Sequence, residues 1–184
     1  MTYNTVQLGD ISEIRGGKRL PKGVNLISSP NSHPYIRIRD MGKSKYLTLN
    51  NEYEYVDNET QKSIARYTVD KDDILISIVG TIGLIGIVGN GLDKANLTEN
   101  CVKIVNLKNV DRQYLYYYLI SPKGQAEITK GIVGAVQPKL PIKNIQQIAI
   151  DLPPIDIQKR IASILASIDD KIAINSTINC NLAA

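Results

Sequence analysis

The end of the sequence constrains the fold most strongly. After Pro154 the chain contains neither glycine nor proline, the two residue types that most readily interrupt a helix. Apolar and asparagine residues recur there at alternating intervals of four and three, which is the a/d pattern of a coiled coil. The pattern predicts a helix of order 40 Å long, at about 1.5 Å per residue. Its heptad seam consists of Ile161, Leu165, Ile168, Ile172, Asn175, Asn179 and Leu182.

A helix with such a seam must bury it against another surface. One interpretation is a second helix, with the asparagines specifying the register of the pair. The alternative is packing against the chain's own globular part. We expect a second helix, because a small domain would leave much of this helix overhanging.

The preceding residues predict short strands and turns, with two helices among them. Tyr35 to Asp40 alternates apolar and charged residues, which indicates a half-buried strand with Arg37 and Arg39 on one face. Asp73 to Val79 is almost entirely apolar, so we expect a central strand that turns at Gly80–Gly83 into a strand over 84–88. Residues 101–105 predict a further strand.

A helix is predicted from Asp111 to Ser121, with its tyrosines in the core because Tyr114, Leu115, Tyr118 and Leu119 recur at helical spacing. The prolines of 137–141 and of 152–154 exclude a helix there. The expected fold class is α+β. A mixed α/β domain over residues 1–153 is followed by a helix over 154–184 that forms an antiparallel coiled coil.

The charge is unevenly distributed. The composition, 43% apolar and 22% charged, is that of a folded protein, and the net charge is only +4. Between Ile14 and Lys45, however, the basic residues Arg15, Lys18, Arg19, Lys22, Arg37, Arg39, Lys43 and Lys45 face a single acid, Asp40. This segment is either a phosphate-binding face or a solvated basic face. His33, in a Pro/Ser/Asn-rich loop, is either a turn residue or a DNA contact.

The sequence offers no catalytic constellation. One loop histidine cannot supply a nucleophile–base–acid set, and the glycines of 80–86 match a nucleotide-binding loop poorly. Leu152-Pro153-Pro154-Ile155 lacks the polar side chain and the ring that an adenine methyltransferase uses on a flipped base. Asp169-Asp170-Lys171, the only nuclease-like acid–lysine triplet, lies in the predicted helix. A binding module remains.

Other classes of protein are excluded in the same way. Cys101 and Cys180 have no CxxC or histidine neighbours, so we expect reduced thiols and no metal site. No signal peptide or membrane-spanning apolar run occurs, so we expect a cytoplasmic protein.

Several segments resemble the specificity subunits of type I restriction-modification systems. They are Leu8-Gly9-Asp10-Ile11 with Arg15-Gly16-Gly17-Lys18, residues 34–40, 72–83 and 95–100, then Gly134 to Leu140, and finally Pro153-Pro154-Ile155 followed by Gln158, Ile161, Leu165, Asp169, Ile172 and Asn175. Together they cover almost the whole chain. Their order is more specific than any one of them.

The resemblance implies a target-recognition domain that reads one half of a bipartite DNA target, and a helix that pairs antiparallel with another. It implies partner subunits that methylate adenine with S-adenosylmethionine, and a restriction subunit that uses ATP and Mg²⁺, whereas this chain has no cofactor of its own. The usual subunit carries two such domains and two helical regions, so we expect a half-length form, natural or truncated, that forms a homodimer on double-stranded DNA.

The residues that contact DNA are predicted from their chemistry, because the resemblance does not carry them over. Lysine and arginine suit phosphates, arginine suits guanine, and asparagine or glutamine suits adenine. Phosphate contacts are expected from Lys18, Arg19, Lys22, Lys43 and Lys45, and base contacts from Arg37, Arg39, Asn96 and Gln137. For Arg37 and Arg39 the alternative is a pair of surface salt bridges, and for Gln137 it is capping of the turn at Pro138.

Two other functions stay open at this point. One is a stand-alone dimer that binds nucleic acid specifically without a modification partner. The other is a structural adaptor whose coiled coil is its whole function, and it would show no salt-dependent affinity for DNA.

Overall fold

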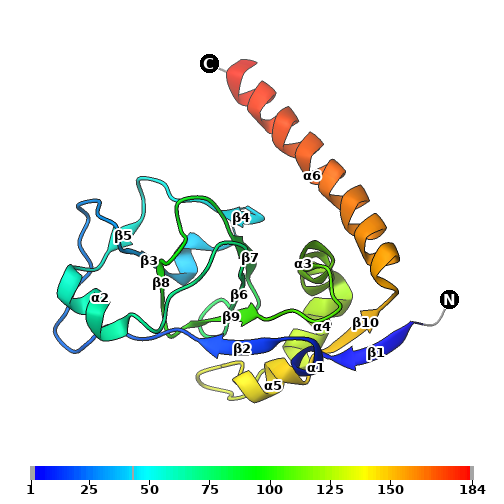
Figure 1. Ribbon diagram of the computed structural model, residues 1–184, viewed down its shortest axis with the longest axis horizontal. Helices are drawn as coiled ribbons and strands as arrows, with labels where there is room; N and C mark the ends of the chain where they lie inside the picture. The colour runs from blue at the N-terminus through cyan, green and yellow to red at the C-terminus, as the bar shows by residue number, and fades with distance from the viewer. Residues whose placement is uncertain (1–2, 43, 183–184) are drawn as a thin grey trace.

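The computed structural model describes residues 3–42 and 44–182. A globular part with three sheets carries one long helix that projects away from it (Figure 1). The fold is α+β with a long C-terminal helix, as predicted. In chain order the elements are β1 (Asn4–Gln7), α1 (Leu8–Ile11), β2 (Glu13–Gly16), β3 (Pro34–Ile36), the 3₁₀ turn η1 (Ile38–Asp40), β4 (Tyr46–Leu47), β5 (Glu54–Tyr55), α2 (Asn58–Ile64), β6 (Ile74–Ser77), β7 (Ile85–Val88), β8 (Asn96–Leu97), β9 (Cys101–Val105), α3 (Arg112–Ile120), α4 (Pro122–Lys130), α5 (Ile142–Gln146), β10 (Ala149–Leu152) and α6 (Ile155–Leu182).

The central sheet has the order β2-β9-β6-β7-β4 and is antiparallel except for the pairing of β4 with β7. It is covered on both faces. In β6, Ile74 and Ile76 pack into one core while Leu75, between them, packs into the other. All of β6 is buried for this reason, which confirms that the unbroken apolar run marks a central strand.

One face of this sheet carries a layer of helices. Its core joins the sheet to α3 through Leu115 and Leu119, to α4 through Ile128, and to α5 through Ile145. The α3 tyrosines predicted for the core are buried there. Their hydroxyls are hydrogen-bonded: Tyr114 donates to the carbonyl of Asp151 at 2.6 Å, and Tyr118 donates to the carbonyl of Ala149 at 3.1 Å.

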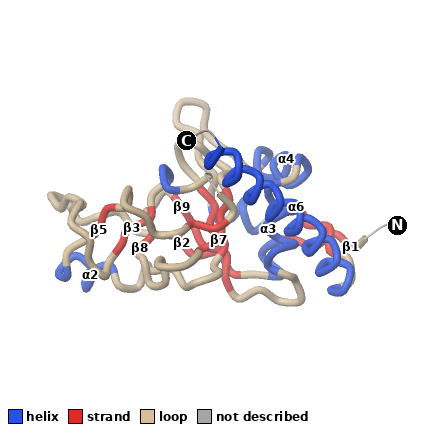
Figure 2. Tube along the Cα trace, turned by 90° about the horizontal axis from the view of Figure 1, so that it is seen from above, coloured by secondary structure: helices blue, strands red, loops and turns tan. Residues whose placement is uncertain are grey.

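The other two sheets lie at opposite ends of the molecule (Figure 2). The sheet β5-β3-β8 stands with α2 at one end. The antiparallel ribbon of β1 and β10 lies at the other end, where α6 begins. The central sheet therefore separates the start of α6 from the loops around β3 and β8.

The strand predicted over Tyr35–Asp40 is wrong beyond Ile36. The Asp40 carboxylate accepts a hydrogen bond from the backbone N–H of Arg37 at 2.7 Å, and this bond closes the 3₁₀ turn. Local bonds from aspartate side chains compete with strand pairing in this way. Arg37 therefore lies before the turn and Arg39 within it. The two arginines are not on one face of a strand, as the alternation had indicated.

The sequence predicted two helices in the first 150 residues, whereas the structure has more. Pro122 ends α3 as predicted, but it also starts α4, because a proline fits the first turn of a helix. The Ser121 side chain caps α4 by accepting from the N–H of Gly124 at 3.1 Å. A side chain at Gly124 would collide with the backbone of Tyr118, with an added Cβ only 2.0 Å from that carbonyl oxygen. Residues 58–64 and 142–146 are also helical.

The long helix α6 is fastened at its base by Gln158, which is 1% exposed. Its side-chain amide donates to the carbonyl of Pro153 at 2.8 Å, and its oxygen accepts from the N–H of Asp111 at 2.8 Å. These bonds satisfy buried backbone groups at the start of both α6 and α3. Ala162 is buried one turn further on. Within the described residues, no helix is both long and apolar enough to cross a bilayer.

Candidate nucleic-acid interface

Four loop segments lie side by side at one edge of the central sheet. The N–H of Lys18 donates to the carbonyl of Leu97 at 2.8 Å, which sets the segment after β2 beside the one before β9. The N–H of Ile78 donates to the carbonyl of Asn100 at 2.8 Å, and the N–H of Leu140 donates to the carbonyl of Ile78 at 2.9 Å. Because these bonds form a chain, the segments present one continuous surface. We call this surface the loop face; it comprises residues 17–22, 78–81, 98–100 and 133–139.

The backbone beside the basic side chains of the loop face is tightly packed. A Cβ on Gly17 would lie 2.0 Å from the carbonyl oxygen of Thr98, so only glycine allows this approach. Lys18, Arg19 and Lys22 follow directly and are exposed. Arg19 pairs with Glu99 at 2.7 Å, yet its side chain is 79% exposed. A surface pair of this kind is weak and can be exchanged for a phosphate.

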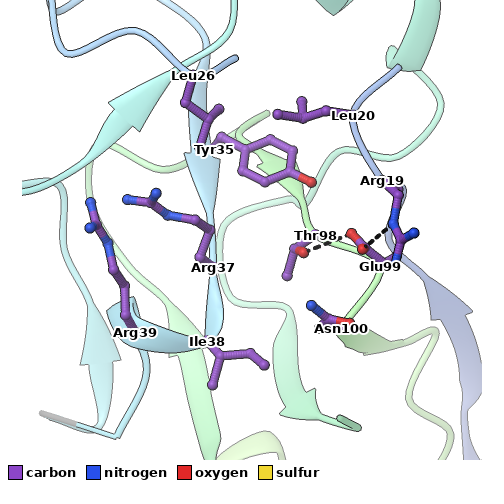
Figure 3. A pocket seen from close by; sticks show the side chains of 10 residues that line it. All are labelled: Arg19, Leu20, Leu26, Tyr35, Arg37, Ile38, Arg39, Thr98, Glu99 and Asn100. Carbon is purple, nitrogen blue, oxygen red and sulfur yellow. Dashed lines mark hydrogen bonds and ion pairs between the residues drawn. The ribbon is translucent and has the colours of Figure 1, made fainter. Parts of the chain in front are cut away.

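A pocket of about 370 Å³ opens beside these residues (Figure 3). Arg37 and Arg39 lie on one side of it, and the Arg19–Glu99 pair lies on the other. The pocket thus combines guanidinium groups, apolar walls and amide donors, the groups that recognise base edges. The rest of its lining comes from Leu20, Leu26, Tyr35, Ile38, Thr98 and Asn100.

Arg37 and Arg39 converge on one carboxylate, that of Glu54. Arg37 contacts it through Nη1, and Arg39 approaches it through Nη2 at 2.9 Å. The structure therefore contains the salt bridges considered as the alternative role for this pair. Nε and Nη2 of Arg37 are buried without a hydrogen-bond partner in the described part of the chain. A base could reach these two donors only if the Arg37 side chain moved, so its contact with a base stays a prediction.

The loop 133–139 is the most prominent part of the loop face. Val133 and Lys139 exchange two backbone hydrogen bonds of 2.9 Å across its neck. Gly134 has a φ of +91°, a conformation that favours glycine. At the tip, Val136 is 94% exposed, and Gln137 beside it is also exposed. Gln137 is thus accessible, as a base contact requires, and its contact with a base stays a prediction. Val136 has no periodic neighbours in the sequence that would have singled it out.

Asn96 and Lys45, two of the predicted DNA contacts, belong neither to the loop face nor to the pocket beside it. Asn96 is 0% exposed and donates to the carbonyl of Ile64 at 3.2 Å, so its position in β8 does not fit a base contact. Lys45 points toward α3, where its Nζ donates to the Tyr117 hydroxyl at 2.9 Å. Lys43 lies outside the described residues. His33 bonds Asn58 at 2.9 Å, as a turn residue would.

The heptad seam divides at the middle of α6. Ile161 and Leu165 pack against the chain's own core, while Ile168 and Ile172 are 48% and 58% exposed. Packing against the chain's own globular part thus holds for the first half of the seam, and pairing of the second half with another helix stays a prediction. Asn175 and Asn179 are exposed as well, and the side chain of Leu182 lies outside the described part.

Two exposed isoleucines extend the free part of the seam. Ile164 and Ile178 are 59% and 49% exposed. At 100° per residue they fall on the same side of α6 as Ile168. The sequence did carry their signal, because Ile157, Ile161, Ile164 and Ile168 form a second register of 4, 3 and 4. We call Ile164, Ile168, Ile172, Asn175 and Ile178 the exposed stripe.

The described residues contain no group of three or more histidine, cysteine or acidic side chains arranged to hold a metal ion. Cys101 is buried, and this burial raises the pKa of its thiol to about 12. It is therefore an unreactive core residue at neutral pH.

Comparison with known proteins agrees with this architecture. A specificity subunit of Haemophilus influenzae, described as a putative type I restriction enzyme subunit, is 32% identical over 87% of this chain and 38% of its own length. The MjaX specificity subunit of Methanocaldococcus jannaschii, also described as putative, is 38% identical over 58% of this chain and 24% of its own length. The chain thus spans well under half the length of these relatives.

Solved structures show the same fold. A chain from a study of complex assembly in the type I R-M system superposes with a TM-score of 0.72 at 20% identity, over 98% of this chain and 41% of that one. The HsdS subunit of Thermoanaerobacter tengcongensis gives 0.67 at 20% identity, over 94% of this chain and 38% of its own. The family described as "Type I restriction modification DNA specificity domain" matches residues 1–184. The chain therefore belongs to the family of type I restriction-modification DNA specificity domains.

Proposed function

We propose that this chain is a DNA sequence-specificity subunit that reads one half-site of a bipartite target through its loop face. The observation that carries the proposal is the match of this family over the whole chain, in a protein whose exposed basic and amide side chains gather at one sheet edge. Lys18, Arg19 and Lys22 bind phosphates, while Gln137 and the pocket at Arg37 contact bases. Residues 1–153 form the recognition domain.

Pairing of two copies through the exposed stripe would let the proposed subunit recognise a second half-site. An apolar stripe on a projecting helix is stabilised by pairing with the same stripe of a second copy, and an antiparallel pair relates the two copies by a twofold axis. The two loop faces then read inverted half-sites separated by unread base pairs. In this proposal residues 154–184 form the spacer, and the exposed stripe within them forms the dimer interface.

Catalysis belongs to partner subunits in this proposal. The chain brings no metal or cofactor of its own to the reaction. The modification subunits bind S-adenosylmethionine and methylate adenine, and a restriction subunit cleaves DNA with ATP and Mg²⁺. The contribution of this chain is to hold those subunits at the target sequence.

The test of this function is the pattern of methylated adenine in cells that express the chain with a type I modification subunit. We expect a single motif of two inverted half-sites with a fixed spacer. Cells with the modification subunit alone are the control, and they should lack the motif. Identical methylation in both would contradict the proposal, and DNA binding by the chain without any methylated motif would favour a stand-alone binding protein.

A further inference from the structure

The helix α6 leaves the globular part at Asp169. Asp169 is partly buried, whereas residues 170–179 are all exposed. From Asp169 to Leu182 the free arm measures about 20 Å at about 1.5 Å per residue. The direction of this arm depends on contacts near Asp169, because no later residue among 170–179 is buried against the domain.

A chain of polar contacts fastens α6 at this point. The Tyr117 hydroxyl, on α3, donates to the Asp169 carboxylate at 2.7 Å. The same hydroxyl accepts from Nζ of Lys45, just before β4, at 2.9 Å. Three segments far apart in the sequence thus meet at one oxygen atom. We call Lys45, Tyr117 and Asp169 the helix latch.

Aromatic rings hold the cation of the latch in place. Nζ of Lys45 lies 4.4 Å from the ring centroid of Tyr117, and 5.4 and 5.6 Å from those of Tyr46 and Tyr116. It also donates to Gln113 at 3.2 Å. Cation–π contacts of this length are attractive and directional.

Burial shapes the protonation of the latch. It lowers the pKa of Lys45, a shift opposed by the negative charges of Asp169 and Asp170. It raises the pKa of Tyr117, and the hydrogen bond to Asp169 acts in the same direction because it requires the phenol proton. The phenol therefore keeps its proton and its role as donor at neutral pH.

The latch is separate from the fastening at the helix base. Gln158 and Ala162 hold the first two turns of α6, and Leu165 packs against the core. A helix held only there can still tilt about its base. The latch lies beyond these contacts, at Asp169, the partly buried residue just before the exposed residues 170–179. Because this point is farthest from the helix base, a contact here restricts the tilt of α6 most strongly.

We propose that the helix latch fixes the direction of the free arm of α6 and thereby determines the spacing between the two half-sites. A tilt of about 10° would move the end of a 20 Å arm by roughly 3.5 Å. This displacement is close to the rise of one base pair, about 3.4 Å. Lys45, Tyr117 and Asp169 are accordingly positioning residues that select spacer length without touching DNA. The effect on spacing rests on the proposed function, whereas the effect on direction does not.

The direction of α6 is measured by electron–electron resonance between spin labels at Ser63→Cys, on α2, and Ser176→Cys, on the free arm. Both positions are exposed. Cys180→Ser removes the other cysteine, and Cys101 stays unlabelled because it is buried. Dilution with unlabelled chain restricts the signal to distances within one copy. Tyr117→Phe and Lys45→Met should broaden and shift a narrow distribution.

Tyr114→Phe is the matched control, since it removes a hydroxyl from the same helix and of the same degree of burial. The Tyr114 hydroxyl bonds the carbonyl of Asp151, in β10, rather than α6. We expect its distance distribution to equal that of the parent. Distributions unchanged in both Tyr117→Phe and Lys45→Met would overturn the latch.

The second measurement is the methylated motif in cells that express these variants with the modification subunit. Tyr117→Phe should accept spacers that differ by about one base pair while the half-sites stay the same. An unchanged spacer together with a broadened distance distribution would overturn the effect on spacing. A broadened distribution in a chain that directs no methylation would support the latch and contradict the proposed function, so the two failures are distinguishable.

Discussion

Ile168→Asp is expected to convert the chain from a dimer into a folded monomer. Ile168 is 48% exposed on α6 and lies within the exposed stripe, so the change leaves the globular core intact. In a paired helix, however, it buries an unpaired carboxylate from each copy, which costs at least about 4 kcal/mol. The dimer dissociation constant should rise roughly 1000-fold. Sedimentation equilibrium over a range of concentrations measures it.

Two further substitutions separate the exposed stripe from the part of the seam that packs inward. Thr177→Asp, nine residues after Ile168, adds the same charge at an exposed position on the opposite side of the helix and should leave the dimer intact. Leu165→Asp should instead destabilise the monomer, because Leu165 packs against the chain's own core. A dimer that survives Ile168→Asp would place the interface elsewhere.

Reversing two charges on the loop face should nearly abolish DNA binding. Lys18 and Lys22 are exposed after β2. Lys18→Glu combined with Lys22→Glu removes two phosphate contacts and adds repulsion. We expect affinity to fall at least about 100-fold at low salt, and the slope of log affinity against log salt to decrease by about 2 per copy. Fluorescence anisotropy with labelled duplex DNA measures both quantities.

Lys108→Glu combined with Lys159→Glu is the matched control. It changes the net charge equally, but Lys108 follows β9 at the opposite end of the central sheet from Lys18. Lys159 lies at the base of α6. Equal losses from the two double variants would show that only net charge matters, which would contradict binding through the loop face.

The large elements could be predicted because their patterns are long and depend on solvent exposure alone. The unbroken apolar run at β6 identified a strand covered on both faces, and the sequence after Pro154 identified α6. Tyr114 and Tyr118 were placed in the core from helical spacing. The order of the family segments along the chain identified the family.

Contacts that neither alternation nor residue chemistry reveals explain where the structure departs from the sequence analysis. The Asp40 carboxylate captures the N–H of Arg37 and closes a 3₁₀ turn, which alternation of residue types cannot reveal. Asn96 looked like a base contact from its chemistry, but it lies in a buried strand of a small sheet. Lys45 was grouped with phosphate contacts by sequence proximity, whereas the fold directs it to Tyr117. These outcomes depend on contacts between residues far apart in the sequence.

The division of the heptad seam was unpredictable for a related reason. Periodicity shows which residues of α6 are apolar, but not where the domain beside it ends. Ile161 and Leu165 meet the core because α3 lies alongside the first half of α6. Ile164 and Ile178 are exposed on the side of α6 that carries Ile168, where a second, overlapping register of apolar residues runs.

Selection of bound sequences from a random pool of duplex DNA by the purified chain tests sequence reading most directly. It needs no partner subunit, and bound DNA is recovered at increasing salt so that phosphate binding without sequence preference is lost first. We predict enrichment of one motif, two inverted half-sites with a fixed unread spacer. Recovery of DNA with no enriched sequence, or no salt-dependent binding at all, would contradict it.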